Sequence, residues 1–276
     1  MIRGATELIA HIGYPTHAFK SPMIYNPYFE QAGVDAVVVP MGCEAAHFPA
    51  LLRAVFTLTN IRGALITMPH KVTTVGLLDV VTIAVRIAGA CNAVRRADDG
   101  SLVGDMFDGE GFVRGVRRKG REIDGSRVLV VGCGGVGSAI AASLAGAKAA
   151  SISLYDTRLD SALALSERLR THYPGLDVRT GSDDPAAHDL VVNATPLGMN
   201  DGDPMPVDVS RIAPSTFVAE VVMKQEMTAF LAAARKRGCA IQVGTDMLFE
   251  QIPAYLEFFG FPSTTPDVLR AVSRLG

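Results

Sequence analysis

A chain of 276 residues is long for a single hydrophobic core, so two domains of ordinary size are expected, and a hydrophobic content of 49% is sufficient to fill both. The formal net charge is -2 and no run of like charges occurs, which argues against nucleic acid or an anionic membrane as a partner. The four cysteines are scattered without metal-ligand spacing, and no apolar stretch reaches the roughly 20 residues of a membrane span. We therefore expect a cytoplasmic protein with reduced cysteines, no bound metal and a small-molecule ligand.

The first part of the chain alternates apolar strands with helices. Strands are expected at residues 7–13, at 35–39, where Pro40 would end the strand, and at 63–67, and helices at 23–32, 46–57 and 72–87. Asp98-Asp99-Gly100 then predicts a hairpin between short strands at 91–96 and 101–105. This order is typical of an open parallel α/β sheet, and ligands bind at the carboxyl edge of such a sheet.

A glycine-rich loop, Gly132-Cys133-Gly134-Gly135-Val136-Gly137, follows the apolar run at 128–131 and precedes a helical run. Gly132 allows a tight turn, Gly134 lets the backbone approach a pyrophosphate, and Gly137 lets helix and strand pack closely. The unpaired N–H groups at the start of the helix would face the anion. The next strand, at 151–155, is followed by Asp156. This context favours dinucleotide binding, although a tight strand-to-helix turn without a ligand would share the pattern.

Beyond the glycine-rich loop the strand–helix rhythm continues. Further strands are expected at 177–180, 189–194, 217–222 and 240–243, and helices at 138–144, 159–172, 227–237, 247–259 and from Thr265 onward. A helix at 109–119 is expected to bridge the two halves of the chain.

Seven short motifs follow one another along the chain. They are Gly13-Tyr14-Pro15 with Ser21-Pro22, Thr67-Met68-Pro69-His70-Lys71, Gly89-Ala90-Cys91-Asn92, Asp108-Gly109-Glu110-Gly111, the glycine-rich loop, the run 193–199 and the run 244–251. In this order they resemble the shikimate dehydrogenase family and its quinate/shikimate dehydrogenase relatives. The resemblance implies two open twisted α/β domains: an N-terminal substrate domain, residues 1–108 with 245–276 returning to it, and a C-terminal Rossmann NAD(P)-binding domain, residues 109–244.

Lys71 and Asp108 are the candidate catalytic residues. Hydride can leave a carbinol carbon for a nicotinamide only if the hydroxyl proton is taken elsewhere, and an alcohol is too weak an acid to lose it unaided. The resemblance implies that Lys71 holds an amine or ammonium at the reacting oxygen and that Asp108 shares the proton. His70 is an alternative general acid, but the resemblance places the role on the adjacent lysine.

The resemblance also implies which residues contact the ligands. Polar contacts to the substrate are expected from Ser21, Thr67, Asn92 and Gln251. The expected cofactor-binding residues are Gly132, Cys133, Gly134, Gly135, Val136, Gly137, Asp156, Asn193, Thr195, Met223 and Gly244.

Four positions depart from the family pattern. Phe19, Leu65, Phe107 and Met223 are apolar where the family offers polar groups to the substrate. A carboxylate left without donors in an apolar pocket is bound far more weakly. We therefore expect a rebuilt substrate site, lined by Phe19, Leu65 and Phe107, that turns over shikimate poorly and prefers a less hydroxylated or differently anchored alicyclic alcohol. A slip of one residue in the alignment of the loop at 14–20 would remove Phe19 from this set.

Cofactor choice is indicated by Tyr155-Asp156-Thr157, which stands where NADP-using members carry Asn-Arg-Thr. An aspartate at this place accepts hydrogen bonds from both ribose hydroxyls and repels a 2′-phosphate, so NAD is favoured. Arg158 could pair with that phosphate and keeps NADP as the alternative.

The function predicted from the sequence is therefore a shikimate dehydrogenase-like oxidoreductase that transfers hydride between a secondary ring alcohol and NAD. Ordinary NADP-dependent shikimate or quinate oxidation is the nearest alternative. A non-catalytic NAD-binding or sensor protein of the same fold is a second, which the retained Lys71 and Asp108 argue against. A methylenetetrahydrofolate-type dehydrogenase has no motif in its favour. The sequence leaves a monomer and a homodimer equally open.

Overall fold

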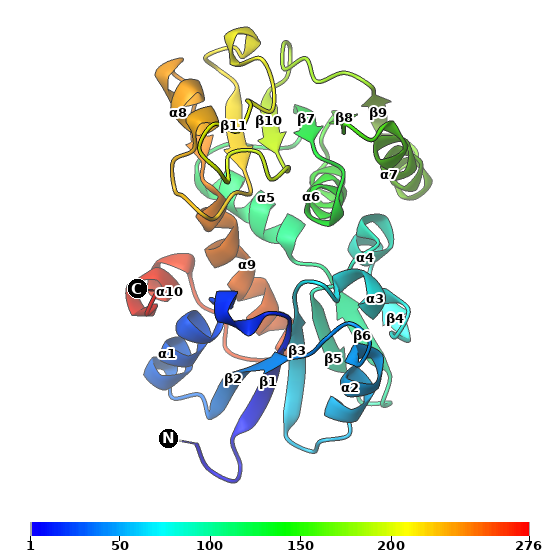
Figure 1. Ribbon diagram of the computed structural model, residues 1–276, viewed down its shortest axis with the longest axis vertical. Helices are drawn as coiled ribbons and strands as arrows, with labels where there is room; N and C mark the ends of the chain where they lie inside the picture. The colour runs from blue at the N-terminus through cyan, green and yellow to red at the C-terminus, as the bar shows by residue number, and fades with distance from the viewer. Residues whose placement is uncertain (1, 276) are drawn as a thin grey trace. The chain divides into compact units, whose positions relative to one another are not determined.

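The computed structural model describes residues 2–275, which form two compact units (Figure 1). Unit 1 consists of residues 2–85, Gly89–Phe107 and 252–275, and unit 2 consists of Arg86–Ala88 and Asp108–Gln251. The segment that returns to unit 1 thus starts at Ile252, whereas the sequence suggested residue 245. No helix within residues 2–275 combines the length and hydropathy needed to cross a membrane.

Unit 1 is built on a mixed sheet. Its strands are β1 (Glu7–Gly13), β2 (Ala36–Gly42), β3 (Ile61–Ile66), β4 (Val80–Val81), β5 (Ala93–Arg96) and β6 (Leu102–Asp105), in the spatial order β2-β1-β3-β5-β6-β4. The pairs β1–β2, β1–β3 and β4–β6 are parallel, while the predicted hairpin partners β5 and β6 pair antiparallel with each other. The carboxyl ends of β1 and β3 therefore meet at one edge of the sheet.

The helices of unit 1 include a C-terminal one. They are η1 (Thr16–Ala18), α1 (Pro22–Ala32), α2 (Phe48–Val55), α3 (Lys71–Val75) and α10 (Pro266–Val272), and α4 (Ile83–Ala88) begins in unit 1 and ends in unit 2. The segment before α10 is fixed to α1, because the Tyr28 hydroxyl donates to the Pro262 carbonyl at 2.8 Å and Phe29 packs on Phe261 with ring centroids 5.1 Å apart. The C-terminal segment is thus part of the unit 1 core.

Two predictions for this unit were wrong. Pro40 does not end its strand, because β2 lies at the edge of the sheet, where a residue without an N–H is tolerated. The single helix predicted at residues 72–87 is replaced by α3, β4 and α4. The break is stabilised by Asp79, whose carboxylate accepts from the Leu102 backbone N–H at 2.7 Å, and by Thr82, which caps the start of α4.

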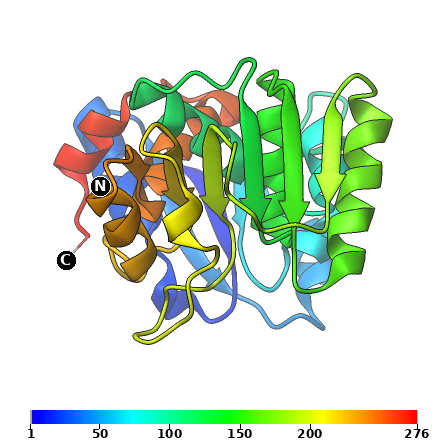
Figure 2. The ribbon, with the colours of Figure 1, turned by 90° about the horizontal axis from the view of Figure 1, so that it is seen from above.

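Unit 2 contains an all-parallel, six-stranded sheet. Its strands are β7 (Arg127–Val131), β8 (Ser151–Tyr155), β9 (Asp177–Thr180), β10 (Leu190–Asn193), β11 (Phe217–Glu220) and β12 (Ile241–Gln242), in the order β12-β11-β10-β7-β8-β9 (Figure 2). The chain starts in the middle at β7, moves outward to β9, and then crosses back to β10 on the other side of β7. The order reverses between β7 and β10, and a doubly wound sheet binds its ligand outside the carboxyl ends at such a point.

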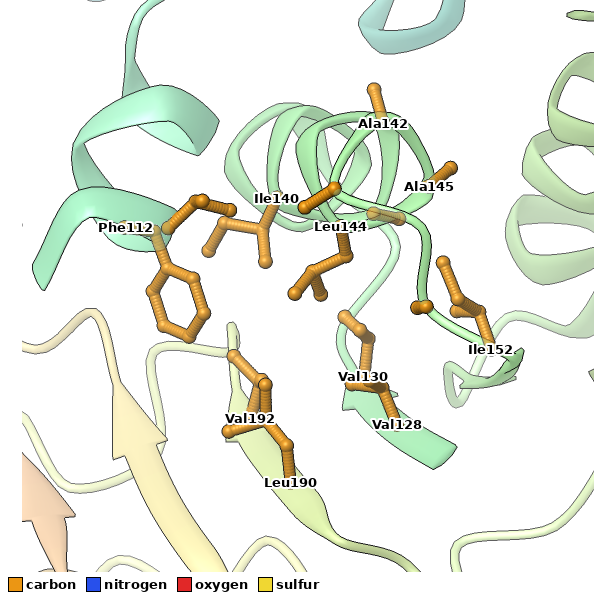
Figure 3. Close-up of a cluster of buried hydrophobic side chains, with 14 of the residues drawn as sticks. Phe112, Val128, Val130, Ile140, Ala142, Leu144, Ala145, Ile152, Leu190 and Val192 are labelled. Carbon is orange, nitrogen blue, oxygen red and sulfur yellow. The ribbon is translucent and has the colours of Figure 1, made fainter. Parts of the chain in front are cut away.

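Helices cover both faces of the unit 2 sheet. They are α5 (Asp108–Arg118), α6 (Gly135–Gly146), α7 (Leu159–His172), η2 (Val209–Arg211), α8 (Ala229–Lys236) and the first half of α9 (Gly244–Phe259). One face of the central strands, with Val128 and Val130, packs against Ile140 and Leu144 of α6 and against Phe112 of α5 (Figure 3). The opposite face packs against α8 in a separate cluster. Successive residues of the buried strands thus face opposite sides of the sheet, and both sides are apolar. Unit 2 therefore has three layers, with the sheet between two layers of helices.

Candidate active site

The predicted site residues of unit 1 gather at the edge where β1 and β3 end. The Thr67 backbone N–H donates to the Ile12 carbonyl at 2.9 Å, and the Tyr14 N–H donates to the Met68 carbonyl at 3.0 Å. A Cβ added to Gly13 would lie 2.4 Å from Cγ2 of Thr67, so only glycine lets the two loops approach this closely. The half-buried Thr67 is thereby held against the loop that follows β1.

Lys71, the predicted catalytic lysine, begins α3 and is half-buried. Its backbone carbonyl accepts from Cys91 at 2.9 Å, which sets the lysine beside the segment that carries Asn92. His70 faces a different environment: it is 1% exposed, its Nε2 donates to the Cys43 carbonyl at 2.8 Å, and its ring stacks on Phe48. The histidine is thus engaged within the core, which favours the lysine over it as the reacting group.

Asn92 is also buried, with 1% of its surface exposed. Its Oδ1 accepts from the Phe107 backbone N–H at 2.9 Å, and its own N–H donates to the Asp105 carbonyl. Asn92 therefore fixes the backbone immediately before Asp108. Ser21, at the start of α1, accepts through its backbone carbonyl from Tyr25, and its side chain makes no capping hydrogen bond.

Three predicted substrate-site residues of unit 1 are built into an apolar environment. Leu65 on β3 is 4% exposed. Phe107 is 8% exposed and packs edge-on against Tyr255 and Phe258 of α9, with ring centroids 4.8 and 5.4 Å away. The half-buried Phe19 stacks on His11 with ring centroids 4.0 Å apart. The structure thus gives each of these side chains packing partners within unit 1.

His11 is a residue that sequence reasoning missed. It lies on β1, is 6% exposed, and burial together with the charge of Lys71 lowers its pKa to about 4. Its Nδ1 is buried and has no hydrogen-bond partner among residues 2–275. A single histidine in an otherwise apolar strand looks like a core residue, and only the pairing of β1 with β3 reveals that it stands opposite Leu65.

The predicted cofactor-binding residues of unit 2 include the glycine-rich loop between β7 and α6. Gly132 has φ of +100°, and a Cβ on Gly137 would lie 1.9 Å from the Gly132 carbonyl oxygen. A Cβ on Gly134 would meet nothing within 4 Å. Gly132 and Gly137 are thus required by the turn itself, whereas Gly134 leaves open space in front of the first turn of α6. That arrangement fits a pyrophosphate on the helix N-terminus.

Asp156 lies directly beside this loop. Its Oδ2 accepts from the Cys133 backbone N–H at 2.8 Å, and its Oδ1 accepts from the Arg158 backbone N–H at 2.9 Å. The Asp156 side chain is 12% exposed and that of Arg158 is 76% exposed, with Nε of the arginine 3.9 Å from Oδ1. A carboxylate therefore stands at the end of β8, where the predicted ribose contact requires it.

Asn193 and Thr195 shape the loop after β10. The Asn193 Oδ1 accepts from the Thr195 hydroxyl at 2.6 Å, and its Nδ2 donates to the Leu197 carbonyl at 2.9 Å. The Asn193 side chain is wholly buried. It therefore holds the conformation of this loop and is not exposed on the loop surface. Beyond β11, Met223 packs partly buried against the unit 2 core, and Gly244 begins α9.

Asp108 and Gln251 lie on two neighbouring helices of unit 2. Asp108 is the first residue of α5 and is 5% exposed, and a helix N-terminus stabilises a carboxylate. Gly111, one turn further on, has no side chain where a Cβ would lie 2.6 Å from that of Gln251. The Gln251 Oε1 is buried without a hydrogen-bond partner in the described part of the chain. It is therefore a candidate to bind a polar ligand group.

A second residue without a predicted role is Glu220, at the end of β11. It is fully buried, its Oε2 accepts from the Thr228 hydroxyl at 2.9 Å, and its Oε1 has no partner within residues 2–275. Burial raises the pKa of Glu220 to about 7, against the opposing effect of the Thr228 hydroxyl and the nearby Asn193 side chain. In the same range of residues, no group of three histidine, cysteine or acidic side chains is arranged to hold a metal ion.

Known proteins share both the sequence and the fold of this chain. The sequence pattern of the shikimate dehydrogenase substrate binding domain matches residues 11–94. An NADP(+)-dependent shikimate dehydrogenase of Rubrobacter xylanophilus is 35% identical, with 100% of this chain and 98% of the relative covered, and that of Acidiphilium cryptum is 33% identical, with 99% and 98% covered.

Two solved structures resemble this chain over almost their whole length. Shikimate 5-dehydrogenase of Listeria monocytogenes, in complex with shikimate and NAD, has a TM-score of 0.92 at 25% identity, with 98% of this chain and 97% of that chain covered. Quinate dehydrogenase of Corynebacterium glutamicum, in complex with NAD, has a TM-score of 0.86 at 27% identity, with 97% and 98% covered. The predicted fold class, a substrate domain followed by a Rossmann domain, is thereby confirmed. By its sequence and its fold, the chain belongs to the shikimate dehydrogenase family and is an NAD(P)-dependent oxidoreductase of the shikimate/quinate dehydrogenase type.

Proposed function

We propose that the protein oxidises a secondary ring alcohol other than shikimate and uses NAD as the hydride acceptor. One observation carries the proposal: the candidate catalytic residues Lys71 and Asp108 are present, while Phe19, Leu65 and Phe107 are apolar and packed within unit 1. A protein that had lost catalysis would have no need of a proton-transfer pair, and one that bound shikimate in the family manner would need polar groups at the three other positions.

Lys71 and Asp108 would manage the proton. When the cofactor is bound, the nicotinamide accepts hydride from the carbinol carbon. Lys71 would take up or stabilise the hydroxyl proton at the reacting oxygen, and Asp108 would fix the charge of the lysine and pass the proton on. The place of Asp108 supports this role, because it is the buried first residue of α5.

The proposed substrate preference follows because the apolar side chains cannot form hydrogen bonds with the substrate. A hydroxyl or carboxylate placed against Leu65 or Phe107 loses its hydrogen bonds to water and gains none from the protein side chain. This reduces the binding free energy by on the order of 1–3 kcal/mol for each unpaired polar group. Two phenylalanine rings also occupy volume that small polar side chains would leave open. A ring alcohol with fewer hydroxyls, or with its acid group elsewhere or absent, fits these constraints better.

NAD is proposed as the cofactor because of Asp156. Its carboxylate would accept hydrogen bonds from the ribose hydroxyls, while it would repel the 2′-phosphate of NADP. The Listeria and Corynebacterium relatives were both solved with NAD, which supports NAD use within the family, whereas the curated relatives are NADP(+) enzymes.

The test is initial-rate reduction of NAD and of NADP by the purified protein. The substrates are shikimate, quinate and a set of cyclic alcohols with and without a carboxylate. We expect a higher kcat/KM with NAD than with NADP, and a higher kcat/KM for at least one other ring alcohol than for shikimate. Efficient shikimate turnover would refute the rebuilt substrate site and return the protein to the ordinary reaction of its relatives.

The Lys71→Ala variant separates an enzyme from a binding protein. Loss of the proton acceptor is expected to lower kcat by a factor of about 100 to 10,000, the typical range for a group in acid–base catalysis. NAD affinity, measured by calorimetry, should stay unchanged, because the glycine-rich loop and Asp156 belong to unit 2. Unchanged turnover in this variant would remove the catalytic assignment of Lys71. Lys20→Ala, which removes an exposed lysine after η1, is the matched control.

A further inference from the structure

His11 lies next to one of the residues that distinguish the substrate site. In the register of β1 with β3, His11 pairs with Leu65. Side chains alternate between the two faces along a strand, so paired residues of neighbouring strands point to the same face. The imidazole and the leucine therefore stand side by side, two residues before β1 ends at Gly13 and one residue before β3 ends at Ile66.

Phe19 covers the imidazole from the loop that follows β1. The two rings stack with centroids 4.0 Å apart and an interplanar angle of 26°. A Cβ on Gly13 would lie 3.0 Å from Cζ of Phe19, so the missing side chain at Gly13 makes room for the phenylalanine ring. His11, with Phe19 stacked on it and Leu65 paired with it, thus forms a cluster in unit 1, here called the His11 wall. Phe19 and Leu65 contribute only carbon and hydrogen to it.

The imidazole brings a polar atom to this surface that the protein itself does not use. Nδ1 of His11 is buried and finds no hydrogen-bond partner in the part of the chain that the structure describes. Burial and the charge of Lys71 keep the pKa of His11 at about 4, so the ring is neutral at ordinary pH and carries one N–H donor and one acceptor nitrogen. Buried polar atoms are normally hydrogen-bonded, and an exception calls for an explanation.

We propose that His11 is a specificity-determining residue of the substrate site, whose neutral imidazole hydrogen-bonds a second hydroxyl group of the ring-alcohol substrate. The proposal rests on the proposed function and narrows its substrate class to ring alcohols that carry a hydroxyl besides the reacting one. A neutral imidazole suits an uncharged hydroxyl, since it can accept from it or donate to it, while the neighbouring Leu65 offers no competing contact.

The position relative to the candidate base supports this assignment. Lys71 is near enough for its charge to lower the pKa of His11, so the two groups belong to the same part of unit 1. A substrate whose reacting hydroxyl lies at Lys71 can therefore place another ring substituent toward the His11 wall. Thr67 follows directly after β3, between Leu65 of the His11 wall and Lys71 in the sequence.

The test compares two substrates that differ by one hydroxyl, cyclohexanediol and cyclohexanol, in the wild type and in His11→Leu and His11→Asn. Leucine keeps much of the volume and removes both nitrogens, whereas the asparagine amide places a polar atom near the position of Nδ1. In His11→Leu we expect kcat/KM for the diol to fall by about 10- to 100-fold, and kcat/KM for the mono-alcohol to change by less than about twofold. His11→Asn should recover most of the preference for the diol.

The readout is the diol to mono-alcohol ratio, because a change that only disturbs the fold would lower both rates together. Thermal unfolding of the variants checks folding, and His11→Asn keeps the test valid if His11→Leu is unstable. Equal losses on both substrates, or an unchanged ratio, would overturn the assignment of His11.

Wild-type activity distinguishes failure of the proposed function from failure of the His11 assignment. If the wild type oxidises no cyclic alcohol of the set, the proposed function is refuted, and the His11 assignment is then decided by calorimetric binding of the same two compounds. Tighter binding of the diol in the wild type, lost in His11→Leu, would support the role of His11. No binding of the diol, or equal affinities in both proteins, would contradict it.

Discussion

At the scale of single residues, we expect cofactor choice to depend on two side chains of opposite charge, Asp156 and Arg158, that stand close together after β8. The Asp156 carboxylate is tied to the glycine-rich loop through the Cys133 N–H, whereas the Arg158 guanidinium is largely exposed. Among the described residues, the carboxylate is held by two backbone N–H donors, whereas the guanidinium is paired with that same carboxylate at 3.9 Å. We therefore expect Asp156 to influence the choice between NAD and NADP more than Arg158 does. Ordering the exposed arginine on binding would cost more side-chain entropy.

The Asp156→Asn variant should relax the preference for NAD. Asparagine keeps an acceptor for the Cys133 N–H and removes the charge that repels a 2′-phosphate. We expect kcat/KM with NADP to rise by about tenfold and kcat/KM with NAD to fall by a similar factor, since a charge-assisted hydrogen bond contributes about 1.5–3 kcal/mol. Steady-state kinetics with both cofactors measures this. The Arg158→Ala control should affect NADP alone, and a loss with both cofactors in that control would contradict the assignment.

Glu220 makes the stability of unit 2 depend on pH. Burial raises its pKa from the ordinary 4.5 to about 7, so the folded protein keeps a proton that the unfolded chain has already released. Between these two values the unfolded state binds fewer protons, and the free energy of unfolding therefore falls as the pH rises from about 4.5 to about 7. The total loss corresponds to roughly 3 kcal/mol, at about 1.4 kcal/mol for each pKa unit.

Glu220→Gln should remove this dependence. Glutamine stays neutral and can still accept from the Thr228 hydroxyl, so the variant should be about as stable as the wild type near pH 5 and more stable above pH 7, by up to roughly 3 kcal/mol. Urea unfolding at a series of pH values measures the difference. Parallel pH profiles of the two proteins would show that Glu220 is not the protonated group. Glu226→Gln, an exposed site in the same segment, serves as the control.

At the scale of elements, the turn from β7 into α6 separates two uses of glycine. A methyl group on Gly137 would collide with the Gly132 carbonyl oxygen, while one on Gly134 would project into space that the protein leaves open. We therefore expect Gly137 to be needed for the fold and Gly134 for binding the ligand. Both belong to the same motif, and the space around each glycine agrees with the role expected from the motif.

Alanine substitutions should reproduce this distinction. Gly137→Ala is expected to lower the free energy of unfolding by about 2–4 kcal/mol, because the strand or the helix must shift. Gly134→Ala should unfold at the temperature of the wild type and bind NAD at least about tenfold more weakly, because its methyl group meets the pyrophosphate. Differential scanning fluorimetry and calorimetric titration with NAD provide the two measurements. Wild-type NAD affinity in Gly134→Ala would place the pyrophosphate elsewhere.

At the scale of the whole molecule, the sequence predicted regular elements well where local patterns decide them. The bounds of β8, α7 and β9 are those expected from the alternation and spacing of apolar residues. The continuation of β2 through Pro40 was not predictable, because it depends on the strand lying at a sheet edge. The break after α3 depends on Asp79 reaching a backbone N–H far along the chain.

The candidate site was predictable only in part, for the same reason. The sequence motifs indicated Lys71 and the glycine-rich loop, since close chain neighbours define them. His11 and Glu220 were missed, because the role of a single polar residue in an apolar strand depends on its tertiary contacts. His11 lies opposite Leu65 in the sheet, and Glu220 accepts a hydrogen bond from Thr228 in the core. The packing of Phe107 on Tyr255 joins residues that are distant in the sequence and was likewise invisible.

Truncation after Gln251 should affect the two units differently. It removes Tyr255, Phe258 and Phe261, which pack on Phe107 and Phe29 in unit 1. We expect residues of unit 1 to lose protection from hydrogen exchange, while unit 2, whose chain ends at Gln251, keeps its affinity for NAD. Exchange measured by mass spectrometry tests both parts. Full protection of β1 and β3 in the truncated protein would contradict this picture.

The chain enters unit 1, leaves it for unit 2 after Phe107, and returns at Ile252. During synthesis, the ribosome releases the sheet of unit 1 long before the aromatic residues that complete its core. The dinucleotide-binding unit, continuous from Asp108 to Gln251 apart from the short piece Arg86–Ala88, is finished first. The N-terminal strands therefore keep apolar surface exposed until the segment from Ile252 onward has been synthesised, and exposed apolar surface makes such intermediates prone to aggregate.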